Sequence, residues 1–238
     1  NVEVMSKMVE EGMDVARINF SHSTEENSNE ILSVIKETEK KTGRNIAVLF
    51  DTKGPDFRCG LIKEGGIPLI KDEIVRIVKD DITGDNGIFT VNYKDALDKI
   101  NVGNTILIDD ALMRLEVVGK DNSSLSCKVI DGGVLTSKKG INVPGVNLGL
   151  NFISEADLKD IKYACSHDGD FLALSFVETS ENVENIRRIL KENGAEDMSI
   201  ISKIETKRAL ENLDAIIDAS DGIMVARGDL GVEVDVER

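Results

Sequence analysis

The segment Val15-Ala-Arg-Ile-Asn-Phe-Ser21 alternates polar and apolar side chains at the end of a short apolar run. In an extended strand, residues two positions apart share a face, so Arg17, Asn19 and Ser21 would line one face and the apolar residues between them the other. A one-sided polar row at the end of a buried strand is typical of the mouth of a (β/α) barrel. The segment therefore indicates that active-site chemistry lies at the carboxyl end of this strand.

Four further apolar runs have the length and composition of buried parallel strands. The five expected strands are Val15 to Phe20, Ile46 to Asp51, Phe171 to Phe176, Ile200 to Glu205 and Ile223 to Asp229. Helical apolar spacing surrounds them, with capping-box signatures at Ser23-x-x-Glu26 and Ser154-x-x-Asp157. This βα repetition fits either a doubly wound sheet or part of a (β/α)₈ barrel. The polar row from Arg17 to Ser21 favours the barrel.

One interval between the starts of consecutive strands, from Ile46 to Phe171, is about four times as long as the others. Within it, helical spacing gives way to short alternating segments separated by glycines, which is typical of a small all-β domain. The strands expected there are Glu73 to Val78, Thr105 to Ile108, Leu115 to Val118 and Leu125 to Ile130. We therefore predict an α/β chain: a partial (β/α)₈ TIM barrel, residues 1–54 and 147–238, interrupted by a small all-β lid domain, a β-barrel, residues 55–146. Gly54-Pro55 and Pro144-Gly145 are the expected pivots.

The composition limits the classes of function. The 238 residues carry 44 acidic and 29 basic side chains, and a net charge of −15 disfavours nucleic acid and anionic membrane surfaces as partners. Cys59, Cys127 and Cys165 are few, scattered and outside any CxxC pair, so we expect packing roles and a reducing compartment, the cytoplasm. No apolar run approaches the roughly 20 residues that a membrane-spanning helix needs.

Two acidic side chains and a lysine end adjacent expected strands. Lys203 and Glu205 would share one face of their strand, and Asp229 would end the next strand. Two carboxylates and water suit Mg²⁺ or Mn²⁺, because hard cations prefer oxygen ligands. A structural ion pair between Lys203 and Glu205 remains an equal alternative.

Other polar side chains allow weaker hypotheses. Asp51 beside Asn19 and Ser21 would offer three oxygen ligands with one negative charge, which suits a monovalent cation, although a hydrogen-bonded polar cluster is the simpler interpretation. The basic residues Arg58, Lys138 and Lys139 lie at the two ends of the expected lid and could clamp phosphate oxygens. His22 follows the polar row and could contact a nucleotide, although a lone histidine is more often structural.

Five motifs occur together along the chain: Ala16-Arg-Ile-Asn-Phe-Ser-His22, Asp51-Thr-Lys-Gly-Pro55, Ser137-Lys-Lys-Gly140, Ile201-Ser-Lys-Ile-Glu205 and Gly222-Ile-Met-Val-Ala-Arg-Gly-Asp-Leu-Gly231. Their order and spacing resemble those of pyruvate kinases, and the resemblance covers the whole length of this sequence. The resemblance implies transfer of the phosphoryl group of phosphoenolpyruvate to ADP, giving pyruvate and ATP, the last step of glycolysis. In the parent protein it also implies a homo-oligomer, a tetramer.

The resemblance also implies roles for individual residues. Lys203 looks like the catalytic lysine that stabilises the phosphoryl group and the enolate, and Arg17 and Arg58 match arginines near the phosphate. The remaining correspondences are Glu205 and Asp229 for Mg²⁺ or Mn²⁺, the turn of Ala226, Arg227, Gly228 and Asp229 for the substrate carboxylate, Asn19, Ser21, Asp51 and Thr52 for K⁺, and His22 and Lys139 for the nucleotide.

The sequence departs from the family at some positions. Asp56 stands where potassium-dependent members have Glu and potassium-independent members often have Lys, and we predict potassium dependence because a carboxylate keeps the site anionic. Cys59 replaces a common Thr. The family's first barrel strand, last two strands and C-terminal domain have no counterpart in these residues, so we expect either a longer parent chain or a poorly active fragment.

Two competing hypotheses remain. Another Mg²⁺-dependent barrel that handles enolates, of the aldolase or lyase type, would explain Glu205 and Asp229 but not the basic residues of the lid. A fragment that binds small anions without turnover is the nonenzymatic alternative. Formation of ATP distinguishes the first alternative, and activity of the longer chain distinguishes the second.

Overall fold

The computed structural model describes residues 1–234 and divides the chain into two compact units. The first unit contains Asn1–Gly54, Phe152–Ile204 and Ala209–Val225. The second unit contains Pro55–Asn151, together with Glu205–Arg208 and the described residues from Ala226 onward. Each unit has its own hydrophobic core.

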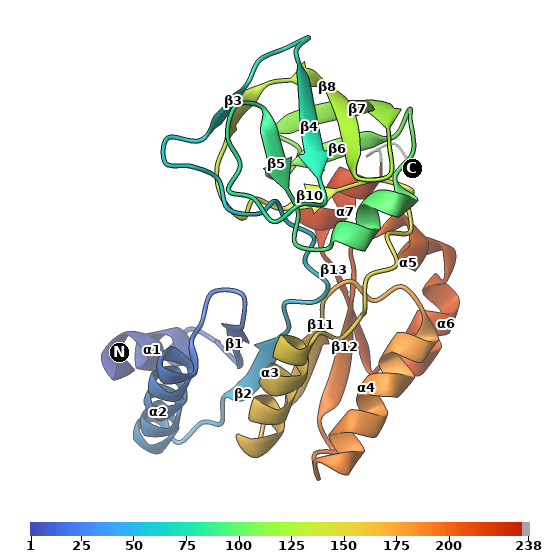
Figure 1. Ribbon diagram of the computed structural model, residues 1–238. Helices are drawn as coiled ribbons and strands as arrows, with labels where there is room; N and C mark the ends of the chain where they lie inside the picture. The colour runs from blue at the N-terminus through green and yellow to red at the C-terminus, as the bar shows by residue number, and fades with distance from the viewer. Residues whose placement is uncertain (235–238) are drawn as a thin grey trace. The chain divides into compact units, whose positions relative to one another are not determined.

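The first unit is built on a five-stranded parallel sheet in the order β1-β2-β11-β12-β13 (Figure 1). Its chain order matches its spatial order, as expected for successive βα units. The strands are β1 (Val15–Asn19), β2 (Ala47–Asp51), β11 (Phe171–Leu174), β12 (Ser199–Ile204) and β13 (Gly222–Val225). Four of the five expected strands are confirmed apart from one or two terminal residues.

The fifth expected strand, Ile223 to Asp229, is wrong in its second half. β13 ends at Val225, and residues Arg227–Glu233 form helix α7 instead. The amide of Leu230 donates to the carbonyl of Ala226, which closes the first helical turn. The apolar run Ile223 to Val225 is only long enough for a short strand, and the polar sequence after it winds into a helix.

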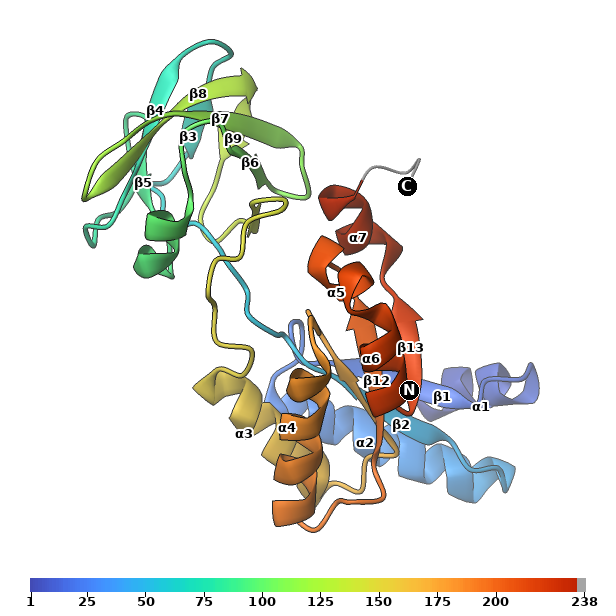
Figure 2. The same cartoon turned by 90° about the vertical axis from the view of Figure 1, so that its right-hand side faces the viewer.

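Helices connect the strands of the first unit, and α4 lies beside α6 in both views (Figures 1 and 2). None of the helices within residues 1–234 is long and apolar enough to cross a membrane. Besides α7, the helices outside residues 55–151 are α1 (Val2–Glu10), α2 (Glu25–Thr42), α3 (Glu155–Ser166), α4 (Ser180–Glu192), α5 (Lys207–Glu211) and α6 (Leu213–Ala219).

Two helix starts were expected from capping signatures. The structure confirms one of them and shifts the other. The capping box of Ser154 and Asp157 at the start of α3 is confirmed in both directions. The start of α2 is shifted by one residue, because Thr24 rather than Ser23 accepts the capping hydrogen bond, from the amide of Asn27 at 3.3 Å. Both residues can cap a helix, so the sequence did not distinguish them.

Asp157 has a second role beside capping α3. Its Oδ2 accepts hydrogen bonds from the amide and hydroxyl of Ser154 at 3.0 and 2.5 Å, while its Oδ1 accepts from the amide of Gly54 at 3.0 Å. Gly54 is where the chain leaves the first unit, and Ser154 is close to where it returns at Phe152. One buried carboxylate therefore holds the outgoing and returning segments together.

The core of the first unit lies between the sheet and its helices. Phe20 and Phe50 stack with their ring centroids 5.4 Å apart, and the ring of Tyr163 from α3 meets both rings edge-on at 6.0 Å. Helices α2 and α4 contribute Ile35 and Ile186, each at most 2% exposed. Burial of side chains of this size contributes roughly 1.5–3 kcal/mol each, which accounts for the docking of amphipathic helices onto the sheet.

Two strands begin with the same carboxylate arrangement at the amino end of the sheet. Asp170, before β11, accepts from the amide of Val48 at 2.7 Å and donates its own amide back to the Val48 carbonyl at 3.0 Å. Asp221, before β13, repeats this exchange with Ile200, at 2.8 and 3.0 Å. Each aspartate therefore fixes the register of its strand against the preceding neighbour.

The second unit contains mainly β-structure. Its six-stranded sheet has the order β10-β6-β7-β8-β4-β5, and β3 pairs separately with β9. The elements are β3 (Ile67–Leu69), β4 (Ile74–Val78), β5 (Ile88–Thr90), the 3₁₀ helix η1 (Lys94–Lys99), β6 (Thr105–Ile108), β7 (Met113–Lys120), β8 (Ser124–Asp131), β9 (Gly133–Leu135) and β10 (Ile141–Asn142). The four strands expected in this region are confirmed as β4, β6, β7 and β8, whereas the short elements were missed.

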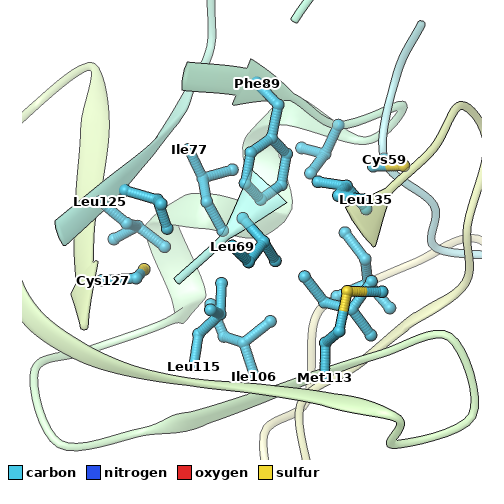
Figure 3. Close-up of a cluster of buried hydrophobic side chains, with 14 of the residues drawn as sticks. Cys59, Leu69, Ile77, Phe89, Ile106, Met113, Leu115, Leu125, Cys127 and Leu135 are labelled. Carbon is cyan, nitrogen blue, oxygen red and sulfur yellow. The ribbon is translucent and has the colours of Figure 1, made fainter. Parts of the chain in front are cut away.

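Side chains from several of these strands interdigitate in one buried cluster (Figure 3). Phe89, Leu115, Cys127 and Leu135 are all fully buried in it. β7 and β8 show the alternation of buried and exposed residues that a sheet with one buried face requires. This cluster shows that the inserted residues form a core of their own.

The ion pair of Asp221 leads to a prediction about stability. Burial alone would raise the pKa of Asp221, but the hydrogen bond and charge of Arg187 and the amide of Ile200 lower that pKa below its ordinary value. A carboxylate with a lowered pKa stabilises the fold at pH values above its unfolded pKa of about 3.9 and loses this effect as the pH falls through the folded pKa. Both side chains are 40% exposed, so solvent screening limits the pair to roughly 0.5–1 kcal/mol.

Asp221→Asn should therefore lower the free energy of urea unfolding at neutral pH, and the difference from the unmodified protein should shrink towards about pH 3. The same substitution at the exposed Asp218 of α6 controls for the loss of one negative charge. A difference between Asp221→Asn and the unmodified protein that is the same at both pH values would contradict the role of the ion pair.

Candidate active site

A group of polar side chains lies at or near the carboxyl ends of β1, β2, β11 and β12 in the first unit. Asn19 and Asp51 are register partners at the ends of β1 and β2. Arg17 is exposed while Ala16 and Ile18 on either side are buried, as the alternating pattern predicted. Parallel strands present these ends at one edge of the sheet, which is where barrel enzymes place their reactive groups.

Asp51 lies at the centre of this cluster and is 1% exposed. Arg17 donates to its Oδ2 through Nε at 2.7 Å and also through Nη2. The ammonium nitrogen of Lys203 lies 3.3 Å from Oδ1, the other carboxylate oxygen. A buried carboxylate is costly unless it is paired, so the cations from β1 and β12 stabilise it here.

Lys203 is held by a serine that the sequence analysis missed. The ammonium donates to the hydroxyl of Ser175 at 2.8 Å, and this hydroxyl donates to the carbonyl of Thr52 at 2.6 Å. The amide of Ser175 donates to the hydroxyl of Thr52 at 3.1 Å. The available signal was a polar residue at the end of the apolar run Phe171 to Leu174, the same signal that Asn19 gives.

The four residues expected to bind a monovalent cation are partly brought together. Asn19 and Asp51 end paired strands, Thr52 follows β2, and the amide of Ser21 donates to the side chain of Asn19 at 2.9 Å. Oδ1 of Asp51 is buried and accepts no hydrogen bond from the described residues, although the Lys203 ammonium lies 3.3 Å from it. A buried carboxylate oxygen, taken with the amide and hydroxyl oxygens of the other three residues, is a donor set that fits a monovalent cation.

His22 lies at the surface of the same edge. Its amide donates to the carbonyl of Asn19 at 3.1 Å, and its ring is exposed. An exposed ring at this position is compatible with a contact to a ligand. The other histidine, His167, has different surroundings. His167 stacks on Tyr163 with a centroid distance of 4.0 Å at the end of α3, which is a packing role.

The basic residues of the second unit form a connected group. Arg58 donates to the carbonyl of Lys138 at 2.9 Å, and the amide of Cys59 donates to the carbonyl of Lys139 at 2.9 Å. Acidic partners fix two of the side chains: Asp56 binds Arg58 at 2.6 Å, and Asp109 binds Lys139 at 2.9 Å. Residues from the two ends of the insertion therefore lie together, as an anion clamp requires.

The two carboxylates expected to bind a divalent metal differ in their surroundings. Glu205 follows β12 directly and is 1% exposed, whereas Asp229 is exposed in the first turn of α7. Within residues 1–234, no three or more His, Cys, Asp or Glu side chains gather as a metal site. Carboxylate oxygens remain suitable donors for Mg²⁺, which binds through one or two carboxylates and keeps several waters.

The turn expected to bind a substrate carboxylate opens α7. Ala226 is the N-cap, its side chain makes no capping hydrogen bond, and Arg227, Gly228 and Asp229 form the first turn. Arg227 and Gly228 are exposed.

The three cysteines are free, and none of them is activated. Burial raises the pKa of the Cys127 thiol to about 12, and burial also raises the pKa values of Cys59 and Cys165. A thiol with a raised pKa is a poor nucleophile and a poor metal ligand. These values agree with the expected packing roles.

Comparison with known proteins supports the resemblance that the motifs indicated. The family model described as pyruvate kinase, barrel domain, matches residues 1–238. The chain is 41% identical to a pyruvate kinase of Bacillus licheniformis and to one of Geobacillus stearothermophilus, covering 100% of this chain and 41% of each relative. It is 38% identical to a pyruvate kinase of Clostridium acetobutylicum, covering 99% of this chain and 50% of the relative.

The chain thus spans two fifths to one half of the length of these curated relatives. The similarity extends over all the strands that carry the polar cluster, including Arg17, Asp51 and Lys203. The chain belongs to the pyruvate kinase family.

Proposed function

We propose that this chain carries the phosphoryl-transfer site of a pyruvate kinase, which transfers the phosphoryl group of phosphoenolpyruvate to ADP and gives pyruvate and ATP in glycolysis. The observation that carries the proposal is the position of Lys203: its ammonium lies at the carboxyl end of β12, 3.3 Å from the buried Asp51, with Arg17 on the same carboxylate. Two cations are therefore fixed at one edge of a parallel sheet.

Fixed cations are what this reaction needs. In phosphoryl transfer, negative charge spreads over the phosphoryl oxygens, and catalysis consists mainly of positioning and electrostatic stabilisation. Lys203 would contact the transferring group and then the enolate oxygen, and Arg17 would bind a phosphate oxygen. Because Arg17 is half exposed, its guanidinium can keep one edge on Asp51 and turn another towards a ligand.

The cation sites complete the proposal. Glu205 and Asp229 would hold Mg²⁺ or Mn²⁺, which supplies Lewis-acid stabilisation of the phosphoryl and enolate oxygens. Asn19, Ser21, Asp51 and Thr52 would hold K⁺; the buried Oδ1 of Asp51 supports this assignment. Asp56 is paired with Arg58, so its effect on potassium dependence would act through that arginine.

The remaining roles concern domains and the nucleotide. Residues 1–54 and 147–238 would form the barrel domain, and residues 55–146 a lid that moves about Gly54-Pro55 and Pro144-Gly145. Closure would bring Arg58 to the phosphate and Lys139, with His22, to the nucleotide, while the turn from Ala226 to Asp229 would bind the substrate carboxylate. We further propose that the full-length protein is a cytoplasmic homo-oligomer, a tetramer, with no nucleic-acid or membrane partner.

The enolate-handling aldolase or lyase alternative is not favoured, because the whole chain matches the pyruvate kinase barrel. The direct test is pyruvate formation from phosphoenolpyruvate and ADP with Mg²⁺, measured on the longest available form of the chain, with K⁺ or with tetramethylammonium in its place. Turnover that needs both cations is expected. Absence of turnover in an intact, longer chain would refute the function, and undiminished turnover without K⁺ would refute the potassium site.

Lys203→Met should lower kcat by roughly 10²–10³-fold or more, because it removes a cation that stabilises developing negative charge. Circular dichroism and thermal unfolding should show an intact fold. The same substitution at the exposed Lys191 of α4 is the matched control and should leave kcat unchanged. Near-normal turnover of Lys203→Met would contradict the proposed catalytic role of this lysine.

Glu205→Gln should raise the Mg²⁺ concentration for half-maximal activity and lower kcat, each by about tenfold or more, because it weakens a metal ligand. Binding of Mn²⁺, followed by electron paramagnetic resonance, provides a readout independent of turnover. Glu211→Gln on the exposed surface of α5 is the control. An unchanged affinity for Mn²⁺ in Glu205→Gln would rule out the assignment of this carboxylate.

A further inference from the structure

Ser175 stands between Lys203 and Thr52, and neither its sequence motif nor the family resemblance assigned it a role. It is 3% exposed, and three hydrogen bonds fix it: one from the Lys203 ammonium, one to the Thr52 carbonyl and one from its own amide to the Thr52 hydroxyl. We propose that Ser175 is a positioning residue that holds the ammonium of Lys203 in its reactive place. The inference rests on the proposed catalytic role of Lys203.

The direction of the hydrogen bonds supports this role. A serine hydroxyl has one proton and two acceptor lone pairs. The proton of Ser175 is committed to the Thr52 carbonyl at 2.6 Å, so the hydroxyl can only accept from Lys203, at 2.8 Å. The carbonyl of Thr52, directly after β2, therefore sets the orientation of the Ser175 hydroxyl that accepts from Lys203. An ammonium on a flexible four-carbon stem benefits from such a directional contact, since the charge of a carboxylate does not by itself select one rotamer.

The backbone around Ser175 is also constrained. Phe176, the next residue, has φ of 56°, in the left-handed region that a bulky aromatic residue rarely adopts. Conformations of this kind are strained and persist where the surroundings enforce them, often at functional sites. The turn after β11 therefore orients the Ser175 side chain, and the strained backbone conformation of Phe176 is part of that turn.

Close packing against Gly54 keeps Ser175 from moving. A Cβ atom at Gly54 would lie 2.9 Å from the Cβ of Ser175 and 2.9 Å from the ring of Phe176, so only glycine fits there. Gly54 itself has φ of 71° and is fixed by Asp157. The segments after β2 and β11 thus fit together tightly, and Ser175 transmits the position of Thr52 to the ammonium of Lys203.

This arrangement predicts which kinetic constant changes. If Ser175 only positions Lys203, its loss weakens an interaction that matters most in the transition state, while substrate binding through other groups remains. Ser175→Ala in the full-length protein should then lower kcat by about 10- to 100-fold, the range of a hydrogen bond to a charged group, with KM for phosphoenolpyruvate changed by less than about threefold.

A matched control is available in the same sheet. Ser202, the residue before Lys203, is 0% exposed, and its hydroxyl is 2.6 Å from that of Ser220, away from the cluster. Ser202→Ala also removes one buried hydroxyl and should leave kcat unchanged. If Ser175→Ala does not fold, Ser175→Cys, which keeps the shape of the side chain but places a larger, weakly accepting sulfur there, carries the same comparison and should lower kcat by a smaller factor.

A double-mutant cycle with Lys203→Met separates positioning from a general structural role. Ser175→Ala should cause no further loss of kcat in the Lys203→Met background. An equal loss in both backgrounds, or unchanged kcat in Ser175→Ala while Lys203→Met is impaired, would overturn the inference and leave the proposed function intact. Near-normal turnover of Lys203→Met would instead overturn the role of the lysine, and the inference with it.

Discussion

The buried charge of Asp51 constrains the first unit more than any other single interaction described above. A carboxylate that is 1% exposed must be balanced, and its cations come from β1 and from β12, two strands on opposite sides of β2. Slipping either strand by one residue would turn Arg17 or Lys203 to the other face and leave the charge unpaired. The register that brings these cations together is thus also the register that keeps the carboxylate stable.

The two ends of the sheet have different roles: the amino ends stabilise the fold, and the carboxyl ends carry the polar cluster. At the amino ends, Asp170 and Asp221 exchange hydrogen bonds with neighbouring strands and fix their register. At the carboxyl ends, carboxylate, ammonium and hydroxyl groups are fixed by one another. This division is the general pattern of (β/α) barrels, whose loops at the carboxyl ends can vary while the opposite ends maintain the fold.

Much of this arrangement could be predicted because it is encoded locally. The alternation around Arg17 gave the face of β1, and Ser154 with Asp157 gave the start of α3. The errors arose where the pattern is ambiguous or the cause is distant. The end of β13 depends on a backbone turn at Ala226, and the importance of Ser175 depends on Thr52, which is more than a hundred residues away in the sequence. The partner of Lys139, Asp109, likewise follows from the packed second unit, not from spacing.

The carboxylate of Asp157 bears on how such a chain can have evolved. Because it binds the amide of Gly54 and the amide of Ser154, the long excursion between them begins and ends at nearly the same point. The inserted residues therefore connect to the sheet in the way that a short loop would. Because the entropy cost of closing a loop grows slowly with its length, the insertion adds little to the free energy of folding the sheet. Domain insertions are tolerated where the ends of the guest lie close together. An ancestral barrel could therefore have acquired, enlarged or exchanged the inserted residues by recombination while the register of its strands stayed the same.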